Sequence, residues 1–171
     1  MRGTAEVVLG IDPGTATTGY GFVRGSLEGD GAFEVVAYGA VETPADDPMP
    51  KRLLAVQHAL SHLVAEHRPS QAAVEKLFFG RNTTTAISVG QARGVVLAAL
   101  AAADVPVFEY TAVEVKRAIA GFGRADKRQM QRMVQALLDL PEVPSPDDAA
   151  DALAIALCHT RLARLRAAGL R

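Results

Sequence analysis

Four acidic residues lie at positions where a carboxylate is costly to bury. Asp12 ends the apolar run V-V-L-G-I, and Glu75 ends the run A-A-V. Asp148 and Asp151 precede the apolar stretch A-L-A-I-A-L. An uncompensated buried carboxylate is strongly destabilising, whereas a hard cation such as Mg²⁺ prefers carboxylate oxygens as ligands. If the four side chains converge, they predict a metal site for phosphoryl transfer, with two divalent ions that activate water and stabilise the leaving oxygen.

Each acid also has an ordinary explanation. The segment S-P-D-D is typical of a helix start, with Ser145 as the N-cap and Asp148 completing a pair that resembles a capping box. Asp12 could form a turn before Pro-Gly. Glu75 could reach solvent at a strand end, and Asp151 could lie at a partly solvated helix edge. These alternatives stay open for each residue taken alone.

The spacing of apolar residues predicts the elements that would position these acids. We expect strands over 6–12, 18–24, 33–42, 71–79 and 105–110, and helices over 51–67, 83–103, 111–120, 126–139 and 146–168. Short connections join the first three strands, which predicts an antiparallel meander, and two parallel strands follow. The expected fold is α/β, a five-stranded mixed sheet with helices on both faces. If the strands of Asp12 and Glu75 are neighbours, both carboxylates face each other at the carboxyl ends, where α/β sheets bind ligands.

Composition limits the class of protein. The chain has 171 residues, 49% of them hydrophobic, which fits a single domain over 1–171, with 166–171 as a candidate disordered tail. One cysteine, Cys158, excludes a disulfide framework and suits a reducing cytoplasm. We expect no signal peptide and no membrane-spanning run. The net charge of −1 argues weakly against nucleic acid, but basic residues gather in 116–132 and 159–171, so a basic face for DNA stays possible.

The chain resembles the bacterial RuvC Holliday-junction resolvases from about residue 7 to residue 160. The resemblance rests on five motifs in order: I-D-P-G-T-A-T-T-G-Y-G (11–21), V-E-K-L-F-F (74–79), G-Q-A-R-G-V (90–95), P-V-F-E-Y (106–110) and D-A-A-D-A-L-A-I-A (148–156). It implies a ribonuclease H-like fold and a homodimer in the cytoplasm. It also implies symmetric nicking of four-way DNA junctions in recombination and repair, with 5′-phosphate and 3′-hydroxyl ends. Mg²⁺ or Mn²⁺, two ions per active site, would be the cofactor, and RuvA and RuvB the partners.

The resemblance also assigns roles to residues. It implies that four carboxylates, which bind the metal, and two lysines are catalytic: Asp12, Glu75, Asp148, Asp151, Lys116 and Lys127. The expected DNA contacts come from the end of a strand and from the basic segment: Phe78, Phe79, Arg81, Asn82, Lys116, Arg124, Lys127 and Arg128. In the family's pattern Phe78 would stack on bases near the crossover. Without the resemblance, Phe78 could be a core residue and both lysines solvated. Asp147 departs from the pattern, but the spacing to Asp151 favours Asp148 as the ligand.

Other functions remain to be weighed. The run L-G-I-D-P-G-T-A-T-T-G resembles the first phosphate loop of the actin and sugar-kinase superfamily, but the sequence has neither a second Asp-Gly loop nor a Gly-rich adenosine motif. A ribonuclease H-like nuclease for structured RNA is a second alternative. A non-catalytic junction-binding protein is a third, although it would be expected to lack an acid or a lysine. The small apolar residues of helix 83–103 suit either the core or a second copy of the chain, and the resemblance favours a dimer.

Overall fold

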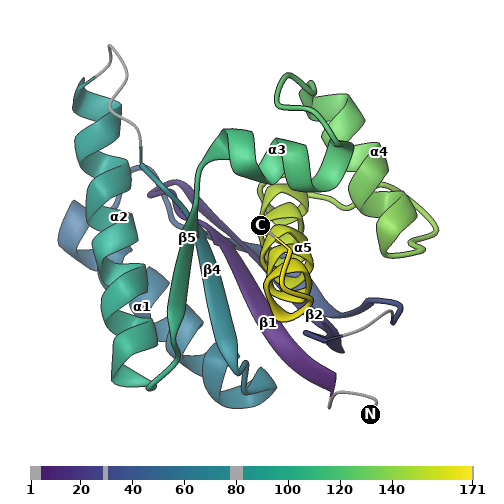
Figure 1. Cartoon of the computed structure of the whole chain (residues 1–171). Helices are drawn as coiled ribbons and strands as arrows, with labels where there is room; N and C mark the ends of the chain where they lie inside the picture. Colours follow the sequence, from purple (N-terminus) through teal and green to yellow (C-terminus); the bar gives the residue numbers. More distant parts are fainter. Residues whose placement is uncertain (1–4, 29–30, 78–82, 171) are drawn as a thin grey trace.

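The computed structural model describes residues 5–28, 31–77 and 83–170 (Figure 1). Within these ranges the chain forms five strands and five helices: β1 (Ala5–Asp12), β2 (Thr17–Ser26), β3 (Glu34–Glu42), α1 (Met49–His67), β4 (Gln71–Glu75), α2 (Thr83–Ala102), β5 (Val107–Tyr110), α3 (Ala112–Ala120), α4 (Lys127–Leu137) and α5 (Asp147–Ala167). All ten expected elements are confirmed. β3 is one residue shorter than expected, and β4 and β5 are shorter by more. β4 ends at Glu75, and β5 begins only after Pro106, which has no amide hydrogen to donate.

The five strands form one mixed sheet in the order β3-β2-β1-β4-β5. β1, β2 and β3 pair in antiparallel fashion, whereas β4 pairs with β1 and β5 pairs with β4 in parallel. The expected meander followed by two parallel strands is therefore confirmed. β1 lies at the centre of the sheet, between the antiparallel strands β2 and β3 on one side and the parallel strands β4 and β5 on the other (Figure 1).

Helices cover both faces of the sheet, as expected (Figure 1). α1 and α2 pack on one face, where Leu9 and Ile11 of β1 join the core cluster of these helices. α3, α4 and α5 pack on the other, where Val8 of β1 contributes to their cluster. Since successive side chains of a strand point to opposite faces, Asp12 falls on the same face as Val8, toward α5. Glu75 shares this face, because Ala73 of β4 belongs to the same cluster as Val8.

α5 lies in direct contact with the backbone of β1 and β2. A Cβ atom added to Gly10 would lie 2.0 Å from the carbonyl oxygen of Ala152, and one added to Gly19 would lie 2.0 Å from that of Asp148. Real Cβ contacts essentially never come so close, so only glycine fits at these two strand positions. The approach fixes how far α5 can slide along the sheet, and therefore fixes the height of Asp148 and Asp151 above it.

The start of α5 differs from the sequence expectation. The N-cap residue is Pro146 rather than Ser145, the helix begins at Asp147, and no side chain caps it. The carbonyl of Pro146 accepts hydrogen bonds from the amides of Ala149 and Ala150 at 3.0 and 3.2 Å. Pro146 is therefore the residue just before the helix, which starts one residue later than expected. The capping-box explanation of Asp148 is therefore wrong. At its other end the helix extends to Ala167, so the first two residues of the expected tail are helical.

α2 exposes much apolar surface. By length and composition its stretch Thr85–Ala102 could cross a membrane, and only 22% of that stretch is buried. The expectation that no run reaches membrane-spanning length is wrong by this measure, although one such helix is weak evidence for a membrane. Ile87 is 63% exposed, and Arg93 interrupts the apolar stretch near its middle. α2 thus presents a surface that α1 and the sheet do not cover.

The close approach of α5 to β1 can be tested with Gly10→Ala. The added methyl group overlaps the backbone of α5, so we expect the free energy of unfolding to fall by about 2 kcal/mol or more. Urea denaturation followed by circular dichroism measures the change. Gly31→Ala is the matched control, since its Cβ would meet the nearest atom at an ordinary 3.7 Å. Equal stability of the two variants would contradict the backbone contact.

Candidate active site

Two of the acids meet where β1 and β4 end. These strands are parallel neighbours, and Ile11 lies opposite Val74 in the register. Asp12 and Glu75 are the next residues of each strand, and both side chains belong to the face that α5 covers. The sequence expectation that these two strands are adjacent is confirmed. The sheet therefore brings two carboxylates to one edge, although they lie far apart along the chain.

A cavity of about 230 Å³ opens at this edge of the sheet. Side chains from β1, β4 and three helices line it: Asp12, Glu75, Ala112, Val115, Lys116, Lys127, Met130, Asp151, Ala154 and Ile155. Five of the six residues expected to be catalytic are in this lining. The sixth, Asp148, lies close enough for its charge to raise the pKa of Asp12 and of Asp151. Charged and apolar side chains thus line one cavity at the carboxyl ends of the strands.

The electrostatics of the cavity disfavour its carboxylates. Burial, followed by the charges of Asp151, Glu75 and Asp148, raises the pKa of Asp12 to about 7, and Lys127 opposes this only in part. Burial and the charge of Asp151 also raise the pKa of Glu75. Burial raises the pKa of Asp151 as well, against the attraction of Lys127. The acids are therefore short of nearby positive charge.

Lys127 is held by two acids at the start of α5. Its Nζ lies 3.0 Å from Oδ2 of Asp147 and 3.7 Å from Oδ2 of Asp151. The Asp147 contact is the main cause of the raised pKa of Lys127. Gln131 Nε2 donates to the second oxygen of Asp147 at 2.9 Å, and the two hydrogen bonds lower the pKa of this exposed acid. Asp147 is thus occupied with α4 outside the cavity, which favours Asp148 as the fourth acid of the cluster.

The donor set suits a divalent cation. In the part of the chain that the structure describes, no three His, Cys, Asp or Glu side chains are arranged so that they could together hold a metal ion. The raised pKa values nevertheless show that burial and mutual repulsion outweigh the attraction of the lysines. A divalent cation would supply the missing positive charge. Since all the candidate ligands are carboxylates, hard ions such as Mg²⁺ and Mn²⁺ fit best.

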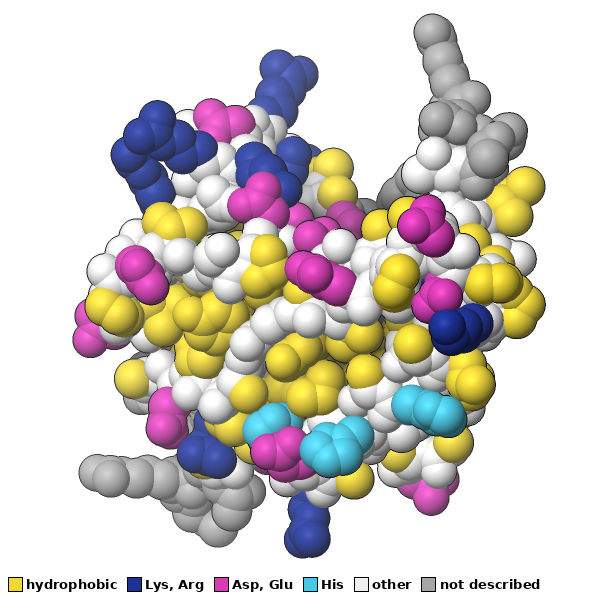
Figure 2. Space-filling view, turned by 180° about the vertical axis from the view of Figure 1, so that it is seen from behind, with side chains coloured by type: hydrophobic (Ala, Val, Ile, Leu, Met, Phe, Trp, Pro, Cys, Tyr) yellow, Lys and Arg dark blue, Asp and Glu magenta, His cyan; other side chains and the backbone are white. Residues whose placement is uncertain are grey.

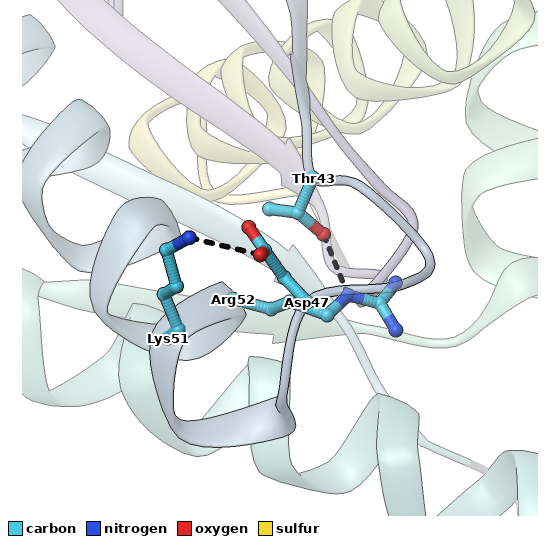
Figure 3. Close-up of polar contacts among 4 residues, drawn as sticks. All are labelled: Thr43, Asp47, Lys51 and Arg52. Carbon is cyan, nitrogen blue, oxygen red and sulfur yellow. Dashed lines mark hydrogen bonds and ion pairs between the residues drawn. The ribbon is translucent and has the colours of Figure 1, made fainter.

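Thr43 supports the turn that follows β1, and Figure 3 shows its contact with Arg52 beside the pair formed by Lys51 and Asp47. The Thr43 hydroxyl donates to the carbonyl of Thr15 at 2.5 Å, and Arg52 Nε donates to that hydroxyl at 2.9 Å. Beside it, Lys51 Nζ lies 2.9 Å from Oδ1 of Asp47. The first turn of α1 thereby holds the turn next to the acid cluster. This support was not predicted, because its only signal in the sequence is a threonine beside a proline-rich loop.

The expected DNA contacts are only partly described. Arg124, Lys127 and Arg128 are exposed around the start of α4. Figure 2 shows Lys and Arg side chains gathered at the end of the molecule formed by α3 and α4, close to a group of acids. Lys116 on α3 is half-buried. The other four expected contacts lie outside the described residues: Phe78, Phe79, Arg81 and Asn82.

Comparisons with known proteins agree with the fold. The family model described as "Crossover junction endodeoxyribonuclease RuvC" matches residues 8–159. A protein of this name from Desulfitobacterium hafniense is 57% identical over 159 residues, which cover 93% of this chain and 94% of the relative. The solved Thermus thermophilus RuvC structure is 39% identical, with a TM-score of 0.85 over 94% of this chain and 97% of that one. The T. thermophilus protein in complex with a Holliday junction substrate is 38% identical, with a TM-score of 0.88 over 95% and 97% of the two chains.

The raised pKa of Asp12 predicts a pH-dependent stability. Folded Asp12 keeps its proton up to about pH 7, whereas the unfolded group loses it near pH 3.8. Without divalent cations, the free energy of unfolding should therefore decrease as the pH rises from about 3.8 to about 7. At pH 8, Asp12→Asn should be more stable than the wild type by about 1–3 kcal/mol, and at pH 3.5 the difference should be small. Urea denaturation in a chelator at both pH values measures this.

Two further measurements sharpen the test. Added Mg²⁺ should stabilise the wild type at pH 8 more than it stabilises Asp12→Asn, because it replaces the missing positive charge. Asp104→Asn is the control, since Asp104 is exposed at the opposite edge of the sheet, after α2. The same pH dependence in wild type and Asp12→Asn would show that Asp12 is not the group that titrates.

Proposed function

The chain belongs to the RuvC family of crossover junction endodeoxyribonucleases, and we propose that it resolves four-way DNA junctions by hydrolysing one phosphodiester in each of two symmetric strands. The observation that carries this proposal is the convergence of Asp12, Glu75 and Asp151 with two lysines around one cavity. Each cut would leave a 5′-phosphate and a 3′-hydroxyl, because the attacking water adds to phosphorus and the 3′-oxygen leaves.

The acids would hold one or two divalent cations. In this proposal Asp12, Glu75, Asp148 and Asp151 are the ligands, and bound cations would supply charge stabilisation for the attacking water and the leaving oxygen. With a pKa of about 7, Asp12 is often protonated at neutral pH, so it must lose a proton in order to serve as a ligand. Metal affinity should therefore rise with pH. The choice between Mg²⁺ and Mn²⁺ is open, since both ions accept the same oxygen ligands.

The lysines would act on the phosphate itself. Lys116 on α3 and Lys127 on α4 line the cavity from the side opposite the strand ends. Their ammonium groups can donate hydrogen bonds to non-bridging phosphate oxygens, on which negative charge grows in the transition state. Asp147 keeps Lys127 beside the cavity without lining it. These lysines are therefore proposed as transition-state donors rather than metal ligands.

The junction DNA would be bound by residues beside this cavity. Arg124 and Arg128 are exposed next to Lys127, where they can contact phosphates of the arms. Phe78 is proposed to stack on bases near the crossover, with Phe79, Arg81 and Asn82 as further contacts. The resemblance is the support for these roles. A ribonuclease H-like nuclease for structured RNA is the alternative, and it would prefer an RNA substrate in the assay below.

Two copies of the chain would match the symmetry of the junction. A four-way junction presents two equivalent strands, and an isologous dimer presents two equivalent active sites. The exposed apolar face of α2 is the proposed contact between the copies. We further propose RuvA and RuvB as partners and the cytoplasm as the compartment. The single nuclease domain expected over 1–171 stays a prediction.

Substitution of the acids tests the catalytic proposal. Asp12→Asn, Glu75→Gln and Asp151→Asn should each lower junction nicking on the order of 100-fold or more, because each removes a charged metal ligand. Junction binding should stay within about threefold, since phosphate contacts dominate it. The assay compares a four-way junction, a linear duplex and an RNA–DNA hybrid in Mg²⁺ and in Mn²⁺.

The control for the acids is again Asp104→Asn, which should cut like the wild type. Wild-type protein that binds junctions but never cuts them with either metal would refute the activity. Equal cutting of all three substrates would refute the junction specificity.

The basic residues should govern the salt dependence of binding. If Arg124 and Arg128 each neutralise one phosphate, the double variant Arg124→Gln/Arg128→Gln should bind with a weaker salt dependence. The negative slope of log affinity against log salt should become shallower by about 2. Fluorescence anisotropy with a labelled junction between low and moderate salt measures this slope. Arg24→Gln, on the exposed end of β2, is the control and should leave the slope unchanged. An unchanged slope in the double variant would place the phosphate contacts elsewhere.

A further inference from the structure

Arg93 is the one charged residue of α2, whose sequence is TTTAISVGQARGVVLAALAA. Its side chain is only 18% exposed, although it lies in the middle of the most apolar helix. A guanidinium group so far removed from water is destabilising unless partners compensate it. The function proposed above does not use this residue, so its partners indicate what it does.

Both partners of Arg93 belong to the sheet. Its Nη2 forms an ion pair with Oε1 of Glu109 on β5, and its Nε donates a hydrogen bond to the backbone carbonyl of Glu75 at 3.4 Å. The planar guanidinium can satisfy two acceptors in fixed directions at once. α2 covers one face of the sheet, whereas the Glu75 carboxylate lines the cavity on the other. Arg93 therefore contacts the backbone of Glu75 from the face of the sheet opposite the cavity.

The end of β4 is held from two directions. On the β5 side, the amide of Lys76 donates to the carbonyl of Tyr110 at 2.7 Å. On the α2 side, Arg93 holds the carbonyl of Glu75 itself. Glu75 is the last residue of β4, so the strand ladder alone does not fix its backbone on both sides. A small rotation of this peptide would move the carboxylate relative to Asp12 and Asp151.

We propose that Arg93 is a positioning residue for Glu75: anchored by Glu109, it holds the carbonyl of Glu75 and thereby sets the position of the carboxylate that binds metal. This inference rests on the metal-binding role of Glu75 in the proposed function. It also connects two parts of the molecule, because α2 carries the surface proposed to meet a second copy of the chain. Arg93 is then the polar contact through which that helix reaches the active site.

A different role would be structural only, with Arg93 neutralising Glu109. Arg93→Lys separates the two roles, because lysine keeps the charge but has no planar fork to bind both acceptors. Glu109→Gln removes the anchor and leaves the arginine in place. The matched controls are Arg24→Gln and Glu34→Gln, which break an exposed arginine–glutamate pair between β2 and β3 at 3.4 Å.

The primary measurement is Mn²⁺ affinity, by electron paramagnetic resonance titration of the full chain without DNA. We expect Arg93→Lys and Arg93→Gln to weaken Mn²⁺ binding about tenfold, the usual effect of removing a contact that orients a metal ligand. Glu109→Gln should act in the same direction. The variant Arg93→Gln/Glu109→Gln should bind Mn²⁺ no more weakly than Arg93→Gln, because Glu109 acts only through the arginine. The Arg24 and Glu34 controls should bind Mn²⁺ like the wild type.

The second measurement is single-turnover nicking of a four-way junction. Arg93→Lys should need about tenfold more Mg²⁺ for half-maximal rate, while its junction affinity stays within about threefold of the wild type. Lower melting temperature with unchanged Mn²⁺ affinity would overturn the proposal and leave Arg93 a structural residue. If Arg93→Gln fails to fold, Arg93→Lys and Glu109→Gln decide the matter in the same way.

The proposal and the function on which it rests can fail separately. Wild-type protein that binds Mn²⁺ through Glu75 but never cuts a junction refutes the activity, and the Mn²⁺ titrations of the Arg93 variants still decide the positioning role. A Mn²⁺ titration that Glu75→Gln leaves unchanged refutes the role of Glu75 as a ligand, and with it the role of Arg93.

Discussion

The contact between the backbone of α5 and the backbones of β1 and β2 sets the geometry of the whole active site. Gly10 and Gly19 provide flat strand surfaces, and the first turns of α5 rest on them without any side chain between. Asp148 and Asp151 project from these turns, whereas Asp12 ends the strand beneath. The distance between the two pairs of acids thus depends on closely packed backbone atoms, which leave little room for the helix to move. A larger residue at either glycine would raise one half of the site away from the other.

The second constraint is electrostatic. The folded protein holds acids where burial and mutual repulsion raise their pKa values, and its lysines compensate them only in part. Such an arrangement lowers the stability of the metal-free protein, because the same residues would be more favourable as neutral side chains. Asp147 lies outside the cavity and binds Lys127 and Gln131, but its charge also raises the pKa of Asp151. Most of the destabilising charge therefore comes from the acids proposed to bind a divalent cation.

Periodicity in the sequence was sufficient to predict much of this arrangement. The apolar runs before Asp12 and Glu75 predicted two strands, and the parallel pairing of neighbours then brought both acids to one edge. The start of α5 was predicted less well, because the segment S-P-D-D matches a local capping pattern that the helix does not use. The DNA substrate and the catalytic role of the two lysines were predicted from the family resemblance rather than from periodicity.

The supporting residues could not be predicted, because their roles come from contacts between distant segments. Arg93 meets Glu109 and Glu75 only after α2 packs on the parallel strands. Thr43 and Arg52 support the turn after β1 only once α1 has packed beside it. No local pattern distinguishes these residues from ordinary polar residues of a helix or a loop. Their partners are visible only in three dimensions.

The order of the strands has a consequence for the growing chain. β1, β2 and β3 pair with their neighbours in sequence, so this half of the sheet can form early, but β4 and α5 must return to β1 from far along the chain. Contacts of such long sequence separation form late in folding. A ribosome-bound chain that lacks α5 also lacks two of the four acids, and therefore has no complete nuclease site. If these acids act as proposed, the protein can cut DNA only after its last helix has docked.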